Sequence, residues 1–198
     1  MSANHLGELA ADTVKQALAA GATDAECTIA EGDEFSAAIR MREIESLKEA
    51  GSRGAGLRVL SGKRAGSAYT SDLSADGIRH MVRSALELAE ITTEDPYQGM
   101  PDTDELGAIT GDLGMYSADV EGLETPLKIE LARRAEEAAL ATDPRISNSE
   151  GASFDSYTGA RAFANSLGFS GFYRTSSCGL SVVPVAKDDN GQLVFGPV

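Results

Sequence analysis

The feature that most constrains the fold is a period-two alternation of apolar and polar residues with a helical pattern on either side. Ala25, Cys27 and Ile29 alternate with more polar neighbours, and a similar alternation runs from Phe35 to Met41. Because successive side chains of a strand point to opposite faces, this pattern predicts strands with one buried face. The residues between the two runs, 31–34, predict a turn, so we expect a hairpin here.

A second hairpin is predicted within residues 56–70, where two strand-like runs flank a turn at residues 61–64. Residues 43–50 are expected to add a strand with weaker alternation. Apolar residues at helical spacing predict a helix that ends at Gly21, and a second helix that Ser74 caps and that runs to about residue 91. Residues 1–91 therefore predict an N-terminal α+β domain of a helix, about four strands and a helix.

The remainder of the chain is expected to form an acidic connector, residues 92–124, and a second domain, residues 125–198. In that second domain Thr125 is the expected cap of a helix that has Pro126 in its first turn and stops at Asp143. Three extended, strand-rich stretches follow. The apolar end of the sequence predicts that the chain continues into a C-terminal domain. The predicted fold class is α+β, with mostly antiparallel sheets, a few helices and two sub-domains.

The acidic excess is local. The chain has 31 acidic and 17 basic residues, a net charge of −14. Eleven of the acids lie between Ser84 and Leu127, where there is no lysine or arginine. A nucleic-acid-binding surface must be basic to displace counterions, so no direct contact with nucleic acid is expected. The acidic block is interpreted as a solvated connector, with a docking surface for a basic partner or cation as the alternative.

Local sequence features predict the cellular compartment and the state of the thiols. The first ten residues lack the basic and apolar regions of a signal peptide, and no apolar run reaches the roughly 20 residues that cross a bilayer. We therefore expect a cytoplasmic protein that makes no membrane contact. The two cysteines, Cys27 and Cys178, lie among strand-like residues and are interpreted as reduced packing residues.

Catalytic and metal-binding patterns are missing from the sequence. His5 and His80, the two histidines, have no acidic residue or cysteine at metal-ligand spacing. The glycine-rich residues 51–56 precede a strand rather than a helix, so they predict turns and not a phosphate loop. Glu43 and Glu45 share a strand face without a histidine or metal partner. We therefore predict that this chain contributes no catalytic residue, no metal ligand and no cofactor site.

Several phrases, in order, resemble the TldD/PmbA family, also called modulators of DNA gyrase. The matching phrases in this sequence are residues 21–26 (GATDAE), 43–46 (EIES), 53–59 (RGAGLRV) and 66–74 (GSAYTSDLS). A later stretch, residues 148–183, is similar to the PmbA branch, also called TldE, more than to the TldD branch. The resemblance covers nearly the whole chain and places it in the N-terminal portion of a PmbA/TldE-like protein.

The resemblance implies a heterodimeric zinc metallopeptidase that acts on unfolded peptides. In the family, the zinc ligands belong to the TldD-type partner subunit, and PmbA-type chains lack them. Zinc is accordingly expected in the partner, and the family supplies no catalytic residue to carry over to this chain. The leading hypothesis is a scaffold and pairing portion of such a subunit. The alternative is a non-proteolytic protein that modulates DNA gyrase or a toxin–antidote system by binding.

A repeated phrase supplies the candidate site. Residues 148–151 and 165–168 both read Asn-Ser, then one residue, then Gly. Asn and Ser favour turns and Gly allows close backbone approach, so the repeat predicts matching bends in two adjacent antiparallel strands. The functional alternative is a strand edge that faces a peptide or the partner subunit, where a peptide could add by main-chain hydrogen bonds. Its nearest contacts would be Asn165, Ser166, Phe172 and Arg174.

Overall fold

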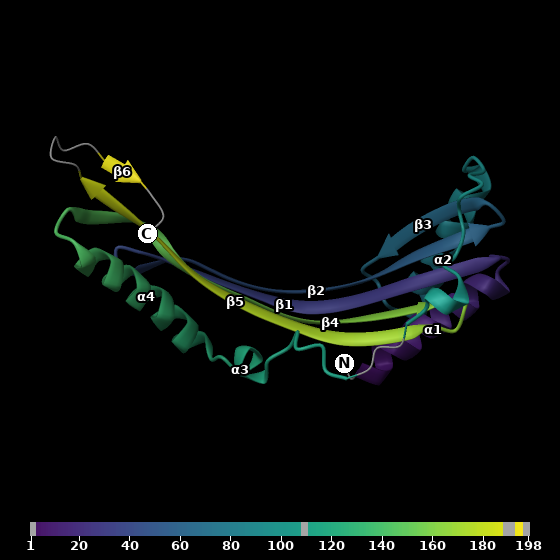
Figure 1. Cartoon of the computed structure of the whole chain (residues 1–198), viewed down its shortest axis with the longest axis horizontal. Helices are drawn as coiled ribbons and strands as arrows, with labels where there is room; N and C mark the ends of the chain where they lie inside the picture. The colour runs from purple at the N-terminus through teal and green to yellow at the C-terminus, as the bar shows by residue number, and fades with distance from the viewer. Residues whose placement is uncertain (1–2, 108–110, 188–192, 196–198) are drawn as a thin grey trace. The chain divides into compact units, whose positions relative to one another are not determined.

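The computed structural model describes residues 3–107, 111–187 and 193–195 (Figure 1). Two of its helices precede the acidic connector, two short helical turns lie within the connector, and one long helix follows it. In chain order they are α1 (Ala3–Ala19), α2 (Ala75–Ile91), the 3-10 turn η1 (Thr103–Glu105), α3 (Ala118–Glu121) and α4 (Thr125–Thr142).

The strands form one six-stranded sheet in the order β3-β2-β1-β4-β5-β6. Their bounds are β1 Asp24–Arg40, β2 Glu43–Ser61, β3 Arg64–Thr70, β4 Ile146–Asn165, β5 Ser170–Lys187 and β6 Leu193–Phe195. The pairs β2–β3 and β5–β6 are antiparallel, with register partners such as Leu57 and Ala68. The predicted α+β class with mostly antiparallel strands is confirmed.

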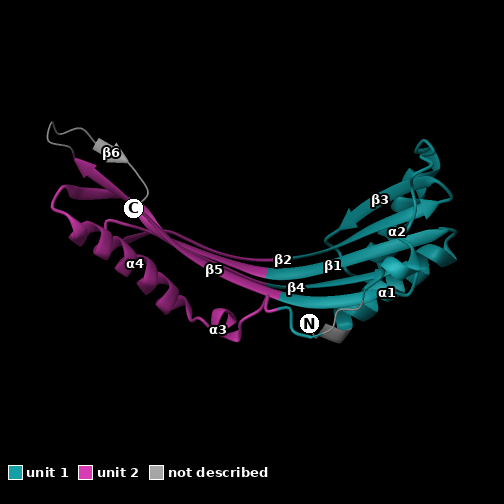
Figure 2. Ribbon diagram, in the orientation of Figure 1, with its two compact units in different colours: residues 1–32, 52–113, 159–174 teal, residues 33–51, 114–158, 175–198 magenta. Residues whose placement is uncertain are grey.

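Chain contacts divide the molecule into two compact units (Figure 2). Unit 1 contains residues 1–32, 52–113 and 159–174, and unit 2 contains residues 33–51, 114–158 and 175–198. The long strands β1, β2, β4 and β5 each contribute residues to both units, so neither unit is one continuous stretch of sequence. The sequential division at residues 91 and 124 stays a prediction.

The core of unit 1 lies between one face of the sheet and the two helices α1 and α2. Leu6 of α1 and Ile78 of α2 share a buried cluster with Cys27 and Leu57 of the strands. Full burial of a side chain as large as Leu or Ile contributes about 1.5–3 kcal/mol. Strand β3 approaches α2 closely at Gly66, where an added Cβ would lie 2.0 Å from the carbonyl oxygen of Ala85.

The core of unit 2 is smaller and depends on α4. Phe35, Ala37 and Ile39 of β1 pack with Phe154 of β4 and Ala132 of α4. The Lys128 ammonium group of α4 lies 4.5 Å from the ring centroid of Phe35, a cation–π geometry.

Two turn predictions are wrong, because a strand continues through each of the predicted turns. β1 continues through residues 31–34 without the expected turn, and β2 continues through the glycine-rich residues 51–56. The β1–β2 reversal lies instead at Met41 and Arg42, whose φ angles are 49° and 69°. Cross-strand hydrogen bonding kept both segments extended against the local turn preference of their glycines.

Helix ends follow the predicted signals with one correction. The Ser74 side chain accepts a hydrogen bond from the Gly77 N–H, so the predicted cap of α2 is confirmed. Thr125 was wrongly predicted to cap α4, because Glu124 occupies the cap position and Pro126 lies in the first turn. The buried residues of α4 are Ala132 and Glu136, and Leu127 is 46% exposed.

Candidate functional site

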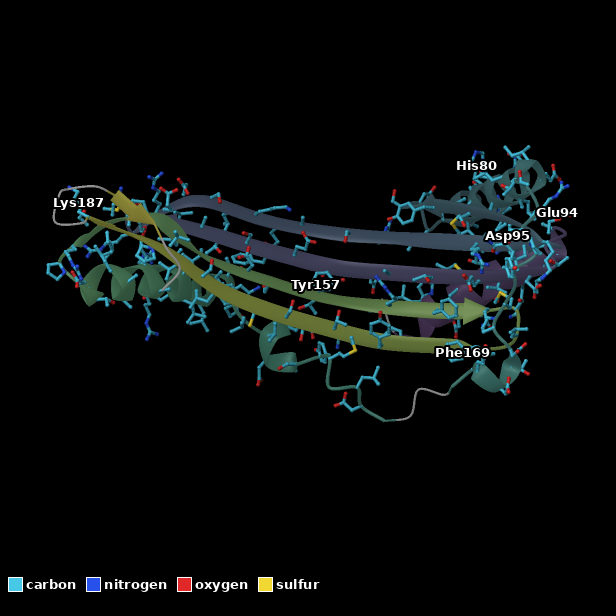
Figure 3. The ribbon with its side chains drawn as sticks, turned by 45° about the horizontal axis from the view of Figure 1, so that its top comes forward. His80, Glu94, Asp95, Tyr157, Phe169 and Lys187 are labelled. Carbon is cyan, nitrogen blue, oxygen red and sulfur yellow. The ribbon has the colours of Figure 1, made fainter. Side chains whose placement is uncertain are left out.

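Asn165 closes the hairpin turn between β4 and β5. Its side chain is 6% exposed, and its Oδ1 accepts hydrogen bonds from the N–H groups of Leu167 at 3.1 Å and Phe169 at 3.0 Å. The ring of Phe169, which is labelled in Figure 3, packs against Phe163 with centroids 5.9 Å apart and an angle of 58°. Asn165 therefore fixes the conformation of the turn, as an Asx-type contact does.

Ser166 ties this turn to the start of β1. Its N–H donates to the carbonyl oxygen of Ala25 at 2.8 Å, and its hydroxyl donates to Asp24 Oδ1 at 3.0 Å. The same hydroxyl accepts from the Ala25 N–H at 3.3 Å. The hydrogen bonds that Asn165 and Ser166 make here are therefore all to other groups within the fold.

Phe172 and Arg174 follow on β5, with side chains on alternate residues of one strand. Phe172 and Arg174 are both half-buried, and Phe172 packs against the unit 1 core. The structure therefore brings the four predicted residues together at the β4–β5 turn and the first residues of β5. Their role toward a peptide or a partner stays a prediction.

The two Asn-Ser phrases have different conformations, so the predicted matching bends are wrong. Residues 165–168 form the hairpin turn, with Gly168 at a φ of 86°. Residues 148–151 lie inside β4, where Gly151 has a φ of 120° and an added Cβ would lie 3.0 Å from the carbonyl oxygen of Ile39. Similar local preferences gave a turn at the strand end and a bend within the strand.

Sequence reasoning missed the buried carboxyl group of Glu136. This α4 residue is fully buried, and its two oxygens accept the N–H groups of Met41 at 2.8 Å and Arg42 at 2.6 Å. The Ser149 hydroxyl also donates to it. Two successive left-handed residues direct their N–H groups to one side, which forms a concavity that suits an anion. Glu136 fills that concavity from within, and its spacing of four from the buried Ala132 could have indicated it.

An open hollow of about 390 Å³ at the start of α2 is lined by Tyr69, Asp72, Asp76 and His80, among others. Hydrogen bonds from Ser74 lower the pKa of the Asp72 carboxyl group. Figure 3 shows His80 on α2, and both His80 and His5 are exposed. We assign no reaction to this hollow.

Two further kinds of reactive group are metal-ligating side chains and thiols. Within residues 3–107, 111–187 and 193–195, no group of three or more His, Cys, Asp or Glu side chains is placed to hold a metal ion. Cys27 is buried, as expected of a packing residue, whereas Cys178 is exposed, so the interpretation of Cys178 as a packing residue is wrong. Both are free thiols. Burial raises the pKa of Cys27 to about 12, so this thiol is not a nucleophile near neutral pH. Among the described helices, none is long and apolar enough to cross a membrane.

The chain resembles proteins of known family along most of its length. It spans a little over a third of the curated relatives that it matches. It is 38% identical over 168 residues to the metalloprotease PmbA homolog of Haemophilus influenzae, covering 85% of this chain and 37% of that protein. It is 36% identical over 178 residues to the metalloprotease PmbA of Escherichia coli O157:H7, covering 89% and 39%.

Solved structures show the same fold. A candidate modulator of DNA gyrase from Bacteroides thetaiotaomicron superposes with a TM-score of 0.84 at 22% identity, covering 94% of this chain and 42% of that one. TldE from Thermococcus kodakarensis superposes with a TM-score of 0.79 at 14% identity, covering 93% and 41%.

Family models match both parts of the sequence. The PmbA/TldA metallopeptidase domain 1 matches residues 25–89, and the PmbA/TldA metallopeptidase central domain matches residues 118–196. These matches lie in the family's domain order and include β1, β2 and β3 in the first segment and α4, β4 and β5 in the second. The chain therefore belongs to the PmbA/TldD metallopeptidase family.

Proposed function

We propose that this chain is the N-terminal scaffold and pairing portion of a PmbA/TldE-type subunit in a heterodimeric zinc metallopeptidase that acts on unfolded peptides. The observation that carries the proposal is 36–38% identity, over most of the chain, to proteins named metalloprotease PmbA. The fold shared with a TldE structure supports the TldE-type assignment. Because the chain spans 37–39% of those relatives, the proposed activity belongs to the whole protein. We propose that this protein acts in the cytoplasm with a TldD-type partner.

Within this proposal the chain contributes a frame rather than reacting groups. The zinc is held by the TldD-type partner. Buried hydrogen bonds at Glu136 and Asn165 hold reversals of the long strands. Such fixed reversals keep the strands in one register, as a scaffold for a partner and a substrate requires.

The strand edge that begins at the β4–β5 turn is proposed to face peptide or partner. Asn165 and Ser166 position the turn, and Phe172 and Arg174 present side chains from β5. Across the outer side of β5 between Ser170 and Thr175, no strand pairs among the described residues. An extended peptide could therefore add there by main-chain hydrogen bonds.

The function is tested by mixing the full-length chain with a TldD-type partner and zinc, and measuring cleavage of an unfolded peptide. Cleavage that needs both chains supports the proposal, and equal cleavage by the TldD-type chain alone contradicts it.

Arg174→Ala in the pair is expected to slow cleavage several-fold, because a contact to the peptide or partner is lost, with an unchanged circular dichroism spectrum. The control is Arg79→Ala, since Arg79 lies on α2 and pairs with Asp76. Unchanged turnover of the Arg174 variant would contradict the proposed contact of this residue with the peptide or partner.

A second candidate function is non-proteolytic modulation of DNA gyrase or a toxin–antidote system by binding. It is favoured by the name of the B. thetaiotaomicron protein, which shares the fold. Binding to the TldD-type partner without any cleavage in the same experiment, together with binding to gyrase in a separate assay, would support this candidate over the first.

A further inference from the structure

The first residues of the acidic connector are hydrogen-bonded to the β2–β3 turn. Shortly after the end of α2, the Asp95 N–H donates to the carbonyl oxygen of Lys63 at 3.0 Å. Lys63 lies in that turn, and its ammonium group donates to the carbonyl oxygen of Gln98 at 2.7 Å. Glu94 and Asp95 are both labelled in Figure 3. We name residues 94–99 the strap.

Arg58 of β2 joins the strap to the body of the sheet. Its Nη2 donates to Gln98 Oε1 at 2.8 Å and to the carbonyl oxygen of Gly99 at 3.4 Å. Its Nη1 donates to Glu26 Oε1 of β1 at 3.1 Å. The Arg58 and Glu26 side chains are 29% and 28% exposed, so this ion pair is partly shielded from water. Because a guanidinium group has several donors in a fixed plane, Arg58 can hold the sheet and the strap at the same time.

The strap has a turn of its own. Asp95 Oδ1 accepts the Tyr97 N–H at 3.0 Å, and the Asp95 carbonyl oxygen accepts the Gln98 N–H at 3.0 Å. Asp followed by Pro favours such a turn, because the Asp side chain bonds the backbone two residues on and Pro suits the second position. The turn places the side-chain and carbonyl oxygens of Gln98 where Arg58 and Lys63 donate to them.

The strap contributes little apolar surface to the core of unit 1. Tyr97 is 93% exposed, and Glu94, Pro96 and Gly99 are exposed as well. The buried cluster of unit 1 contains residues of α2, such as Ile78, but none of residues 94–99. A segment that is held by polar contacts and buries little apolar surface opens at a low free-energy cost. We therefore expect the strap to open while the core stays folded.

Charge makes the attachment of the strap sensitive to salt. Three basic side chains, those of Arg58, Lys63 and Arg64, surround a strap that belongs to the acidic block of the chain. Arg64 Nε lies 3.5 Å from Glu94 Oε1, and the two side chains are 43% and 68% exposed. Such exposed attractions weaken as ionic strength rises, since the Debye length falls from about 10 Å at 0.1 M salt to about 3 Å at 1 M.

We propose that the strap is a conformational device that detaches from the β2–β3 turn independently of the unit 1 core, and that ionic strength sets how often it detaches. When the strap is attached, the connector leaves the fold after Gly99. When it is detached, the connector leaves the fold at the end of α2 and is longer. The contacts lie within this chain, so the proposal goes beyond the peptidase proposal and its test is separate.

Hydrogen–deuterium exchange of the full-length chain measures the opening of the strap directly. At low ionic strength the amides of Asp95 and Gln98 are expected to be protected, yet to exchange about tenfold or more faster than the core amides of α2. In 1 M sodium chloride they are expected to exchange several-fold faster again, with the α2 amides unchanged. Strap amides without protection at low ionic strength, or as slow as the α2 amides at every ionic strength, would contradict the proposal.

Two variants test the named contacts. Gln98→Ala removes an acceptor of Arg58 and leaves the sheet intact, and Lys63→Ala removes a donor to the strap, so each is expected to speed exchange at Asp95 several-fold. The matched controls are Gln16→Ala and Lys15→Ala, since both residues are exposed on α1 and Lys15 makes an ion pair at 3.0 Å. Protection of the α2 amides should be the same in all four variants, which shows that the fold is intact. Exchange of the strap that neither Gln98→Ala nor Lys63→Ala alters overturns the proposal.

Discussion

At the scale of single residues, Gly66 determines how closely β3 can approach α2. A Cβ at this position would lie 2.0 Å from Ala85 O and 2.5 Å from Ala89 N, both backbone atoms of the helix. Since backbone cannot rotate away, Gly66→Ala is expected to lower the free energy of unfolding by about 1–3 kcal/mol. Urea denaturation measures the loss. Gly56→Ala is the control, because an added Cβ there meets nothing within 4 Å, and an equal loss in both variants would contradict the close-approach argument.

Glu136 is the second residue on which the fold depends. Replacing it by Gln leaves one oxygen, and the new amide N–H₂ group must face the N–H of Met41 or of Arg42. A buried donor without an acceptor costs about 1–3 kcal/mol, so Glu136→Gln is expected to lower the free energy of unfolding by that amount. Urea denaturation again measures it. Glu137→Gln is the control, because the Glu137 side chain is 47% exposed and lies 3.9 Å from Arg42. Equal stability of wild type and Glu136→Gln would show that the turn does not need the carboxyl group.

At the scale of elements, the sequence predicted most helices and strands but not where long strands reverse. Helical spacing located α1 and α2, and the Ser74 signal located the start of α2, because both depend on residues near one another in sequence. The turns predicted at residues 31–34 and 51–56 failed because their glycines lie in strands that neighbouring strands keep extended. The true reversal at Met41 and Arg42 has no glycine, and a carboxyl group 95 residues away in sequence from Met41 stabilises it.

The candidate site shows the same division between local and distant information. The Asn-Ser-x-Gly repeat correctly indicated that the backbone bends at both places, since Gly151 and Gly168 both have positive φ. It did not indicate that one bend is a hairpin turn. That depends on Ser166 meeting Asp24 and Ala25, contacts that span 142 and 141 residues of sequence. Local pattern alone cannot specify such pairs.

At the scale of the whole molecule, residues 1–91 depend on a segment of β4 to complete their core. The unit 1 core includes Ala162 and Ala164 of β4, and Ser166 holds the start of β1. A fragment of residues 1–91 lacks these groups, which leaves one side of β1 unpaired and part of the core open to water. We therefore expect the fragment to unfold at a lower urea concentration than the 198-residue chain, with a broader transition. A fragment as stable as the whole chain would establish residues 1–91 as an independent domain. A flexible linker that joins residues 1–91 to residues 159–174 is the informative control. Because it restores the missing strand segment, stability should return toward that of the intact chain if β4 is what the fragment lacks.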